Sequence, residues 1–284
     1  MMARILLLAL LACIGCSQNE PMTDSNPTAD ELFQVELAQR GLQYTINKDG
    51  LYEIAIGDVN ATVNLENVRR NYERDRDHET VTRFAQQLND DFFGAIPSWA
   101  DVQPFIRFSL EPSDYQSGFA DTLHQIVNPE LVKVFVYVPP DGSRISWITK
   151  SMVADWKVEN ETVVSLANKN MGLIASETQL ESQEIDGVPL GMLNTQETHF
   201  KASLILTSKF RDLVSPTHGW PVYVVIPARD FVYVVPKENG DFLGRLGSVV
   251  LREYNESGYP VSQEVFEVGN DGMKAIGSFA PEGG

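Results

Sequence analysis

The sequence has few cysteines and histidines and is poor in positive charge. It contains 2 Cys, 4 His and 22 Lys and Arg against 39 Asp and Glu, a formal net charge of −17. Such an acidic surface repels nucleic acid and anionic headgroups, so we expect no nucleic-acid partner. Cys13 and Cys16 form a CxxC pair, but there is no second cysteine pair to complete a zinc site.

The N-terminal apolar segment is too short to span a membrane. Ile5–Ile14 offers about ten apolar residues, whereas a spanning helix needs ~20. Arg4 precedes this run, and small residues lead from it to Cys16. This order is typical of a bacterial lipoprotein signal peptide, which predicts cleavage and acylation.

Cys16 is the predicted site of lipid attachment, because it follows the longer apolar run and precedes Ser17 and Gln18. Cys13 is the alternative, since the Leu-Leu-Ala before it also fits a lipoprotein signal. A diacylglycerol with an added acyl chain such as palmitate would be a stable anchor, whereas one chain binds only marginally. We therefore expect a protein tethered to a membrane of the bacterial cell envelope, on the periplasmic face or the cell surface.

Apolar periodicity and turn residues predict an α+β fold with antiparallel or mixed sheets built from hairpin-then-helix units. Acidic, weakly apolar residues 176–186 are the predicted boundary between two packed lobes. The predicted organisation, by residue number, is a signal peptide (1–16), a flexible tether (17–30), an N-terminal lobe (31–175), a C-terminal lobe (188–277) and a tail (278–284).

A hairpin is predicted near the start of the folded chain. Residues 42–46 and 51–56 are short alternating runs, and Asn47–Gly50 between them is a turn signal of the Asp-Gly type.

Several other elements can be placed individually. Leu131–Val138 is apolar on both faces, which predicts a central strand. Glu66–Phe93 predicts two consecutive helices broken near Asp75–Asp77. Asn160 is the predicted N-cap of a further helix, and Phe200–Leu206 is a predicted strand.

Short blocks of sequence resemble the YtpQ family, also called domain of unknown function 1444. They occur in the family's order and cover most of the chain from about residue 40 to 270. The blocks are Val63–Asn67, Ser98–Val102, Phe135–Val138, Ile148-Thr149, Trp156–Val158, Ala167–Met171, Val224–Asp230 and Tyr259–Ser262. Lys157 departs from the family, which usually has Gly after the Trp. The family carries no established activity, so the resemblance implies an architecture and little chemistry.

Familiar catalytic motifs are incomplete. His78-Glu79 begins like the HExxH of zinc proteases, but Thr82 stands where the second histidine ligand belongs. The sequence has neither a Gly-x-Ser-x-Gly elbow nor a phosphate-binding loop. We therefore assign no catalytic residue, no metal site and no cofactor from the sequence.

Arg229 and Asp230 are the candidate ligand-binding pair, in a predicted turn between two apolar strands. A guanidinium there could hold a carboxylate or a phosphate. The competing interpretation is a turn stabilised by Pro227 and Asp230, with Arg229 paired locally. Asn168 and Asn170 are weaker candidates.

These features favour a non-enzymatic binding or scaffold module that engages an envelope protein or cell-wall component near the membrane. One alternative is an enzyme of unrecognised, hydrolase-like type. The other is a small-ligand carrier that uses Arg229 to hold an anionic group.

Overall fold

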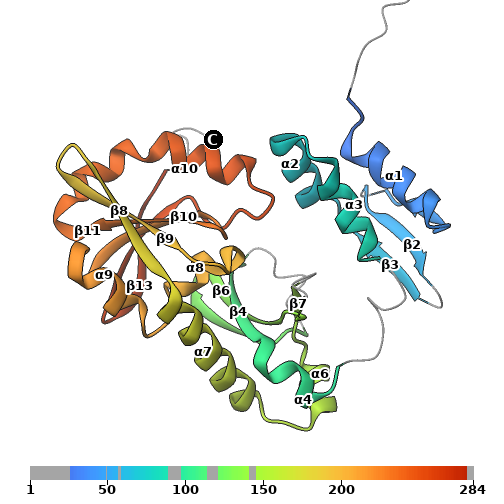
Figure 1. Ribbon diagram of the computed structural model, residues 1–284, viewed down its shortest axis with the longest axis horizontal. Helices are drawn as coiled ribbons and strands as arrows, with labels where there is room; N and C mark the ends of the chain where they lie inside the picture. Colours follow the sequence, from blue (N-terminus) through green and yellow to red (C-terminus); the bar gives the residue numbers. More distant parts are fainter. Residues whose placement is uncertain are drawn as a thin grey trace, which may run out of the picture.

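The computed structural model describes residues 26–48, 50–56, 59–88, 97–113, 121–140 and 145–279. Cys13, Cys16, the rest of the predicted signal peptide and most of the predicted tether and tail lie outside this range. The described residues form an α+β fold with three antiparallel sheets, as predicted (Figure 1). No described helix is both long enough and apolar enough to cross a membrane.

The described residues up to 88, here called the N-terminal unit, form a three-stranded sheet with helices packed on one face (Figure 1). The predicted hairpin is confirmed, with Gly50 at φ +76° in its turn. The predicted helix break is also confirmed, since Arg76 is left-handed and Asp77 caps the second helix. The elements are α1 (Ala29–Gln39), β1 (Tyr44–Ile46), β2 (Tyr52–Ile56), β3 (Val59–Val63), α2 (Glu66–Asp75) and α3 (His78–Gln86).

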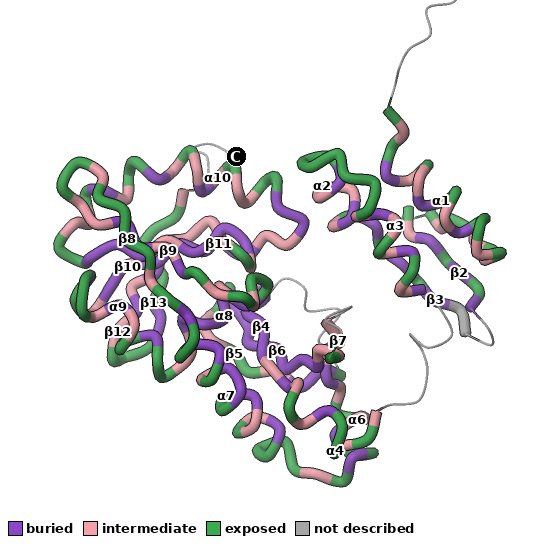
Figure 2. The backbone as a smooth tube through the Cα atoms, viewed as in Figure 1, coloured by how far each residue is buried: buried purple, intermediate pink, exposed green. Residues whose placement is uncertain are grey.

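The N-terminal unit has a hydrophobic core of its own (Figure 2). Phe33 of α1 is fully buried and meets the ring of Tyr52 edge to face at 5.1 Å between centroids. Asp30 links α1 to β2 and α2 at the edge of this core. It accepts hydrogen bonds from Arg69 at 2.7 and 2.8 Å and from Tyr52 Oη at 2.8 Å. Arg69 thereby lowers the pKa of Asp30.

The described residues from 97 to 279, here called the main body, begin with a second sheet around β6. All seven residues of β6 are buried, which confirms the predicted central strand. It pairs with β4 on one side and with β5 and β7 on the other. The elements are α4 (Trp99–Val102), β4 (Ile106–Pro112), β5 (His124–Asn128), β6 (Leu131–Tyr137), β7 (Ser146–Trp147), α6 (Lys150–Trp156) and α7 (Asn160–Glu177).

The third sheet has six strands in the order β13-β12-β10-β11-β9-β8. Alternate residues of its central strands enter two different cores, so both faces are covered. Val224 packs in the core that includes α9, and Val225 in the core that includes α10. The elements are β8 (Gln179–Ile185), β9 (Val188–Asn194), α8 (Lys201–Leu204), α9 (Phe210–His218), β10 (Val222–Ala228), β11 (Phe231–Pro236), α10 (Gly247–Glu256), β12 (Glu264–Gly269) and β13 (Gly272–Ser278).

The distribution of buried residues differs from the expected two lobes. Residues 176–186, the expected boundary, contain β8, an exposed strand that pairs with β9 at the end of the six-stranded sheet. The largest core takes residues from both sides of that segment, including Phe135 and Phe266. The separate core instead belongs to the N-terminal unit, which ends at residue 88.

Two local predictions are wrong. Asn160 is the first residue of α7 rather than its N-cap, because Glu159 is the residue with extended backbone before the helix. Phe200–Leu206 is not a strand: it forms the end of a short 3-10 helix and α8. Phe200, Ala202 and Leu204 alternate as in a strand, but a run this short fits a buried helical turn equally well.

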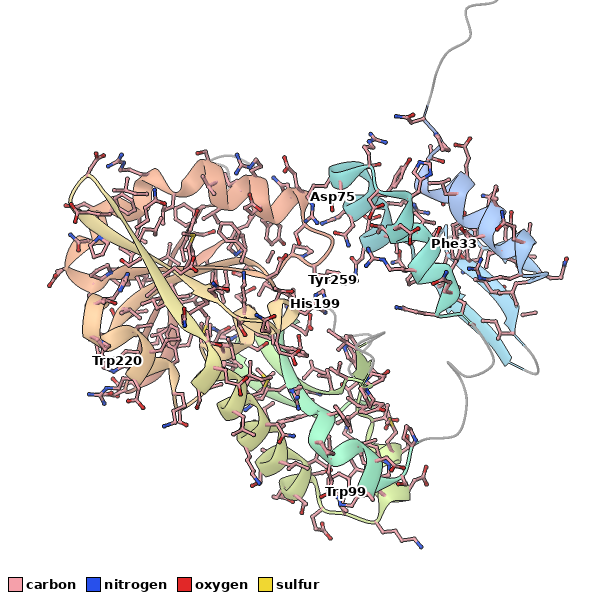
Figure 3. All side chains as sticks on the ribbon, in the orientation of Figure 1. Phe33, Asp75, Trp99, His199, Trp220 and Tyr259 are labelled. Carbon is pink, nitrogen blue, oxygen red and sulfur yellow. The ribbon has the colours of Figure 1, made fainter. Side chains whose placement is uncertain are left out.

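The N-terminal unit touches the main body through α2 and the chain that follows α10. The amide of Gly258 donates a hydrogen bond of 3.1 Å to Asn71 Oδ1. A Cβ at Gly258 would collide with the side-chain amide of Asn71, so a larger residue there would displace Asn71 from this contact. Asp75 and Tyr259 mark the two sides of the contact in Figure 3.

Candidate functional site

Arg229, the first candidate residue, is engaged in a buried ion pair. Its Nη2 lies 2.6 Å from the carboxylate of Glu111 on β4, and its Nε lies 3.2 Å away. The Glu111 side chain is 1% exposed and that of Arg229 is 14% exposed. Ser109 Oγ donates to the same carboxylate at 2.6 Å, and the Tyr259 ring centroid is 4.6 Å from the guanidinium carbon. The guanidinium therefore holds an internal carboxylate, and its partner is 118 residues away rather than local.

Asp230, the second candidate, is exposed. The pKa of Arg74 on α2 is raised mainly by its hydrogen bond to Asp75, and the negative charges of Asp230 and Glu253 add to this effect. Asp230 thus contributes to the field at the contact between the two parts. Arg229 and Asp230 therefore interact with different groups, Arg229 with Glu111 and Asp230 with the charge of Arg74.

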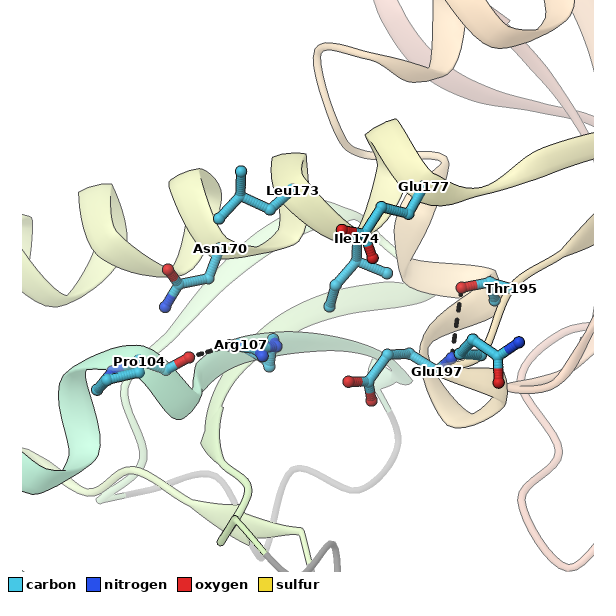
Figure 4. Close-up of a pocket in the computed structure, with 9 residues that line it drawn as sticks. Pro104, Arg107, Asn170, Leu173, Ile174, Glu177, Thr195 and Glu197 are labelled. Carbon is cyan, nitrogen blue, oxygen red and sulfur yellow. Dashed lines mark hydrogen bonds between the residues drawn. The ribbon is translucent and has the colours of Figure 1, made fainter.

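A pocket of about 230 Å³ lies elsewhere, between β4, the C-terminal half of α7 and the connection that follows β9 (Figure 4). Its lining includes one cation, two carboxylates, two amides and two aliphatic side chains. These are Arg107, Glu177, Glu197, Asn170, Gln196, Leu173 and Ile174. β4 is an edge strand of its sheet, which leaves its outer side open to side chains from α7 and residues 195–197.

Arg107 is the cation of this pocket. Its Nη1 donates to the carbonyl oxygens of Pro104 at 2.7 Å and Ile106 at 3.1 Å. Its Nε and Nη2 make no hydrogen bond to a described residue. Burial lowers the pKa of Arg107, and the charge of Glu197 acts in the opposite direction. The guanidinium stays protonated and keeps one two-donor edge unused within the described chain.

The two carboxylates do not neutralise Arg107 by direct contact. Within the part of the chain that the structure describes, neither Glu177 nor Glu197 lies within 4.0 Å of a basic group. The backbone amide of Glu197 donates to Thr195 Oγ1 at 3.3 Å, a contact that helps to hold this turn. Beside them Leu173 is 59% exposed, although it sits on a helix with a buried face. The pocket therefore presents separated opposite charges next to an apolar patch.

Comparison with known proteins assigns the chain to no family. The chain matches no family model, no curated protein and no solved structure. The resemblance to the YtpQ family therefore rests on the quoted residues alone.

The incomplete zinc motif gains no second metal ligand from the described residues. His78 is exposed at the start of α3. Among the described residues, no three His, Cys, Asp or Glu side chains come together as a metal site.

Lys133 is a buried cation that the sequence analysis did not single out. It lies on β6 and is 9% exposed. Its Nζ donates to Asn168 Oδ1 at 2.6 Å and is 3.9 Å from the ring centroid of Phe108. Burial lowers its pKa to about 8. The sequence could have indicated a buried lysine here, since Lys133 is the one charged residue in the otherwise apolar run 131–138.

The two asparagines that were weaker candidates both make internal contacts. Asn168 accepts the hydrogen bond from Lys133, and Asn170 donates to the carbonyl oxygens of Gln103 at 2.9 Å and Ile106 at 3.0 Å. Asn170 also lines the pocket, where it fixes the chain next to Arg107. Arg107 itself carried no sequence signal, because its pocket is assembled from three segments far apart in the chain.

Replacing Lys133 with methionine should change how stability depends on pH. Burial lowers the pKa of Lys133 from its ordinary 10.5 to about 8, so between these pH values the unfolded chain binds more protons than the folded one. The free energy of unfolding of the wild type should therefore rise with pH relative to Lys133→Met. The gain is up to about 3 kcal/mol, and the Phe108 ring opposes it by favouring the charged form. Urea unfolding at pH 7.5, about 9 and about 10.5 checks this; a constant difference would contradict it.

Proposed function

We propose that the protein is a lipid-anchored lipoprotein of the bacterial cell envelope whose folded part is a non-enzymatic binding module. The observation that carries the binding role is the pocket beside β4, where Arg107 and two glutamates lie near one another without pairing. Charged groups in such a setting are suited to a ligand that completes their contacts. The predicted signal peptide and Cys16 support the anchor.

The small-ligand carrier remains an alternative, but its ligand would bind at a different arginine. Arg229 is already satisfied by Glu111, so the anion-holding role passes to Arg107. The scaffold interpretation is supported by the exposed Leu173 at the mouth of the pocket, which adds apolar surface for a partner. The resemblance to the YtpQ family remains part of the proposal and adds no activity.

An enzyme of unrecognised type is the second candidate function, and Lys133 is the observation in its favour. A lysine whose pKa is lowered by burial is a base or nucleophile near neutral pH. Its Nζ is held against Asn168 and the Phe108 ring, beneath α7. A binding activity that survives Lys133→Met would favour the module over the enzyme.

The anchor can be tested by removing each cysteine in turn. Cys16→Ala should leave an unprocessed or soluble form, because no thiol would remain at the acylation position. Cys13→Ala is the matched control and should still be processed and fractionate with membranes. The measurement is membrane fractionation with mass spectrometry of the mature N-terminus. The reverse pattern would transfer the anchor to Cys13, and membrane retention of the double variant would refute lipid attachment at either cysteine.

The binding role can be tested by cross-linking in cells, followed by affinity purification and mass spectrometry. The wild type should capture an envelope component that is lost from Arg107→Gln and from Glu197→Gln. Arg252→Gln is the control, since Arg252 is 57% exposed on α10, away from the pocket. Capture that is equal in all four proteins would show that the pocket has no part in binding.

A further inference from the structure

We propose that the pocket beside β4 binds a free amino acid as a zwitterion, through its carboxylate and its ammonium group at once, and prefers a basic amino acid. The inference rests on the binding function proposed above and names the chemical class of the ligand.

Arg107 is placed to receive the carboxylate. Pro104 and Ile106 hold Nη1 through their carbonyl oxygens, which fixes the plane of the guanidinium. The edge formed by Nε and Nη2 has no partner among the described residues, and two parallel N–H donors match the two oxygens of a carboxylate. Arg229 differs, because its Nε and Nη2 both donate to Glu111. Arg107 is therefore the guanidinium that a ligand can use.

Glu197 and Glu177 are placed to receive the ammonium group. Both line the same pocket as Arg107, and Glu197 is close enough for its charge to act on the pKa of Arg107. No basic group of the described chain lies within 4.0 Å of either carboxylate. A purely anionic ligand would therefore meet two like charges, whereas a zwitterion meets an opposite charge at each end.

The size and net charge of the pocket restrict which amino acids would fit it. A volume of about 230 Å³ is smaller than the ~300–1,000 Å³ of pockets that take drug-sized ligands. Leu173 and Ile174 offer apolar surface for a short alkyl chain. Two carboxylates against one guanidinium leave one negative charge, which favours a ligand with a second amine.

The test is a set of small probes that differ by one end group. The probes are L-lysine, L-alanine, L-alanine methyl ester, which lacks the carboxylate, and N-acetyl-L-alanine, which lacks the ammonium group. Isothermal titration of the full-length protein in detergent should give the tightest binding for L-lysine. L-alanine should bind ~10–100-fold more tightly than either blocked form, since each block removes a charged hydrogen-bonding group. Equal affinities for free and blocked forms, or no binding of L-lysine at millimolar concentration, would overturn the inference.

Variants assign each end group to a residue. Arg107→Gln should remove the penalty for blocking the carboxylate, and Glu197→Gln should reduce the preference for L-lysine over L-alanine. Arg252→Gln should bind all four probes as the wild type does. Thermal unfolding verifies that each variant is folded. If Arg107→Gln does not fold, Glu197→Gln and the four probes still test whether the pocket binds a zwitterion. Pocket-dependent cross-linking without amino-acid binding would refute this inference alone, whereas loss of both would refute the proposed function as well.

Discussion

Replacing Arg229 with alanine should lower the free energy of unfolding of the main body by ~3–5 kcal/mol. The substitution leaves the carboxylate of Glu111, which is 1% exposed, with the hydroxyl of Ser109 as its remaining side-chain partner among the residues that the structure describes. A buried charge that loses its counter-charge is strongly destabilising because water cannot replace the lost contact. The change would also free the β10–β11 turn from β4, and so loosen the six-stranded sheet from the sheet around β6.

Tryptophan fluorescence during urea unfolding measures this effect selectively. All 4 tryptophans, at positions 99, 147, 156 and 220, belong to the main body. Arg252→Ala is the exposed control and should change stability by less than ~0.5 kcal/mol. The double variant Glu111→Leu with Arg229→Met should lose much less stability than Arg229→Ala, since no charge is left unpaired. If Arg229→Ala unfolds like Arg252→Ala, the ion pair does not join the two sheets as described.

Replacing Phe33 with alanine should unfold the N-terminal unit while the main body stays folded. Phe33 is fully buried in a core that no main-body residue joins, and Phe→Ala changes in a core cost ~3–5 kcal/mol. A unit of roughly 60 residues has little stability to spare. Peptides from α1, β2 and α3 should then exchange their amide hydrogens rapidly, whereas the tryptophan unfolding transition should be unchanged.

Val35→Ala is the matched control on the same helix. Val35 is 53% exposed, so its truncation should leave hydrogen exchange of the N-terminal unit as in the wild type. Phe33 lies in the N-terminal unit, whereas Trp99 and Trp220 lie in the main body, so each probe reports on one part (Figure 3). A joint shift of both signals in Phe33→Ala would mean that the two parts unfold as one.

The fold class and many elements followed from the sequence because their signals are local. The alternation in β2, the turn at Gly50 and the break at Arg76-Asp77 each depend on a few neighbouring residues. The strand β6, apolar except for Lys133, was recognisable for the same reason. β8 was not, since its exposed residues resemble a linker and only pairing with β9 makes the segment a strand.

The site was much less accessible to sequence reasoning. Arg229 and Arg107 are the same residue type in strand-end surroundings, and nothing local shows which one has an internal carboxylate. The answer depends on Glu111 lying across from one turn and on α7 crossing the edge of β4, both of which are long-range contacts. Ion pairing over 118 residues cannot be read from spacing.

In the lipid-anchored form proposed above, the exposed edge strand β8 would have a further consequence. Copies fixed to one surface meet in two dimensions, with their bodies kept at a similar height and their sheet edges free to collide. An unpaired edge invites strand exchange between neighbours. β8 presents Glu181 and Glu184 there, both exposed, so two such edges repel before their backbones can pair. The acidic side chains of β8 would thereby limit edge-to-edge strand pairing between closely spaced anchored copies.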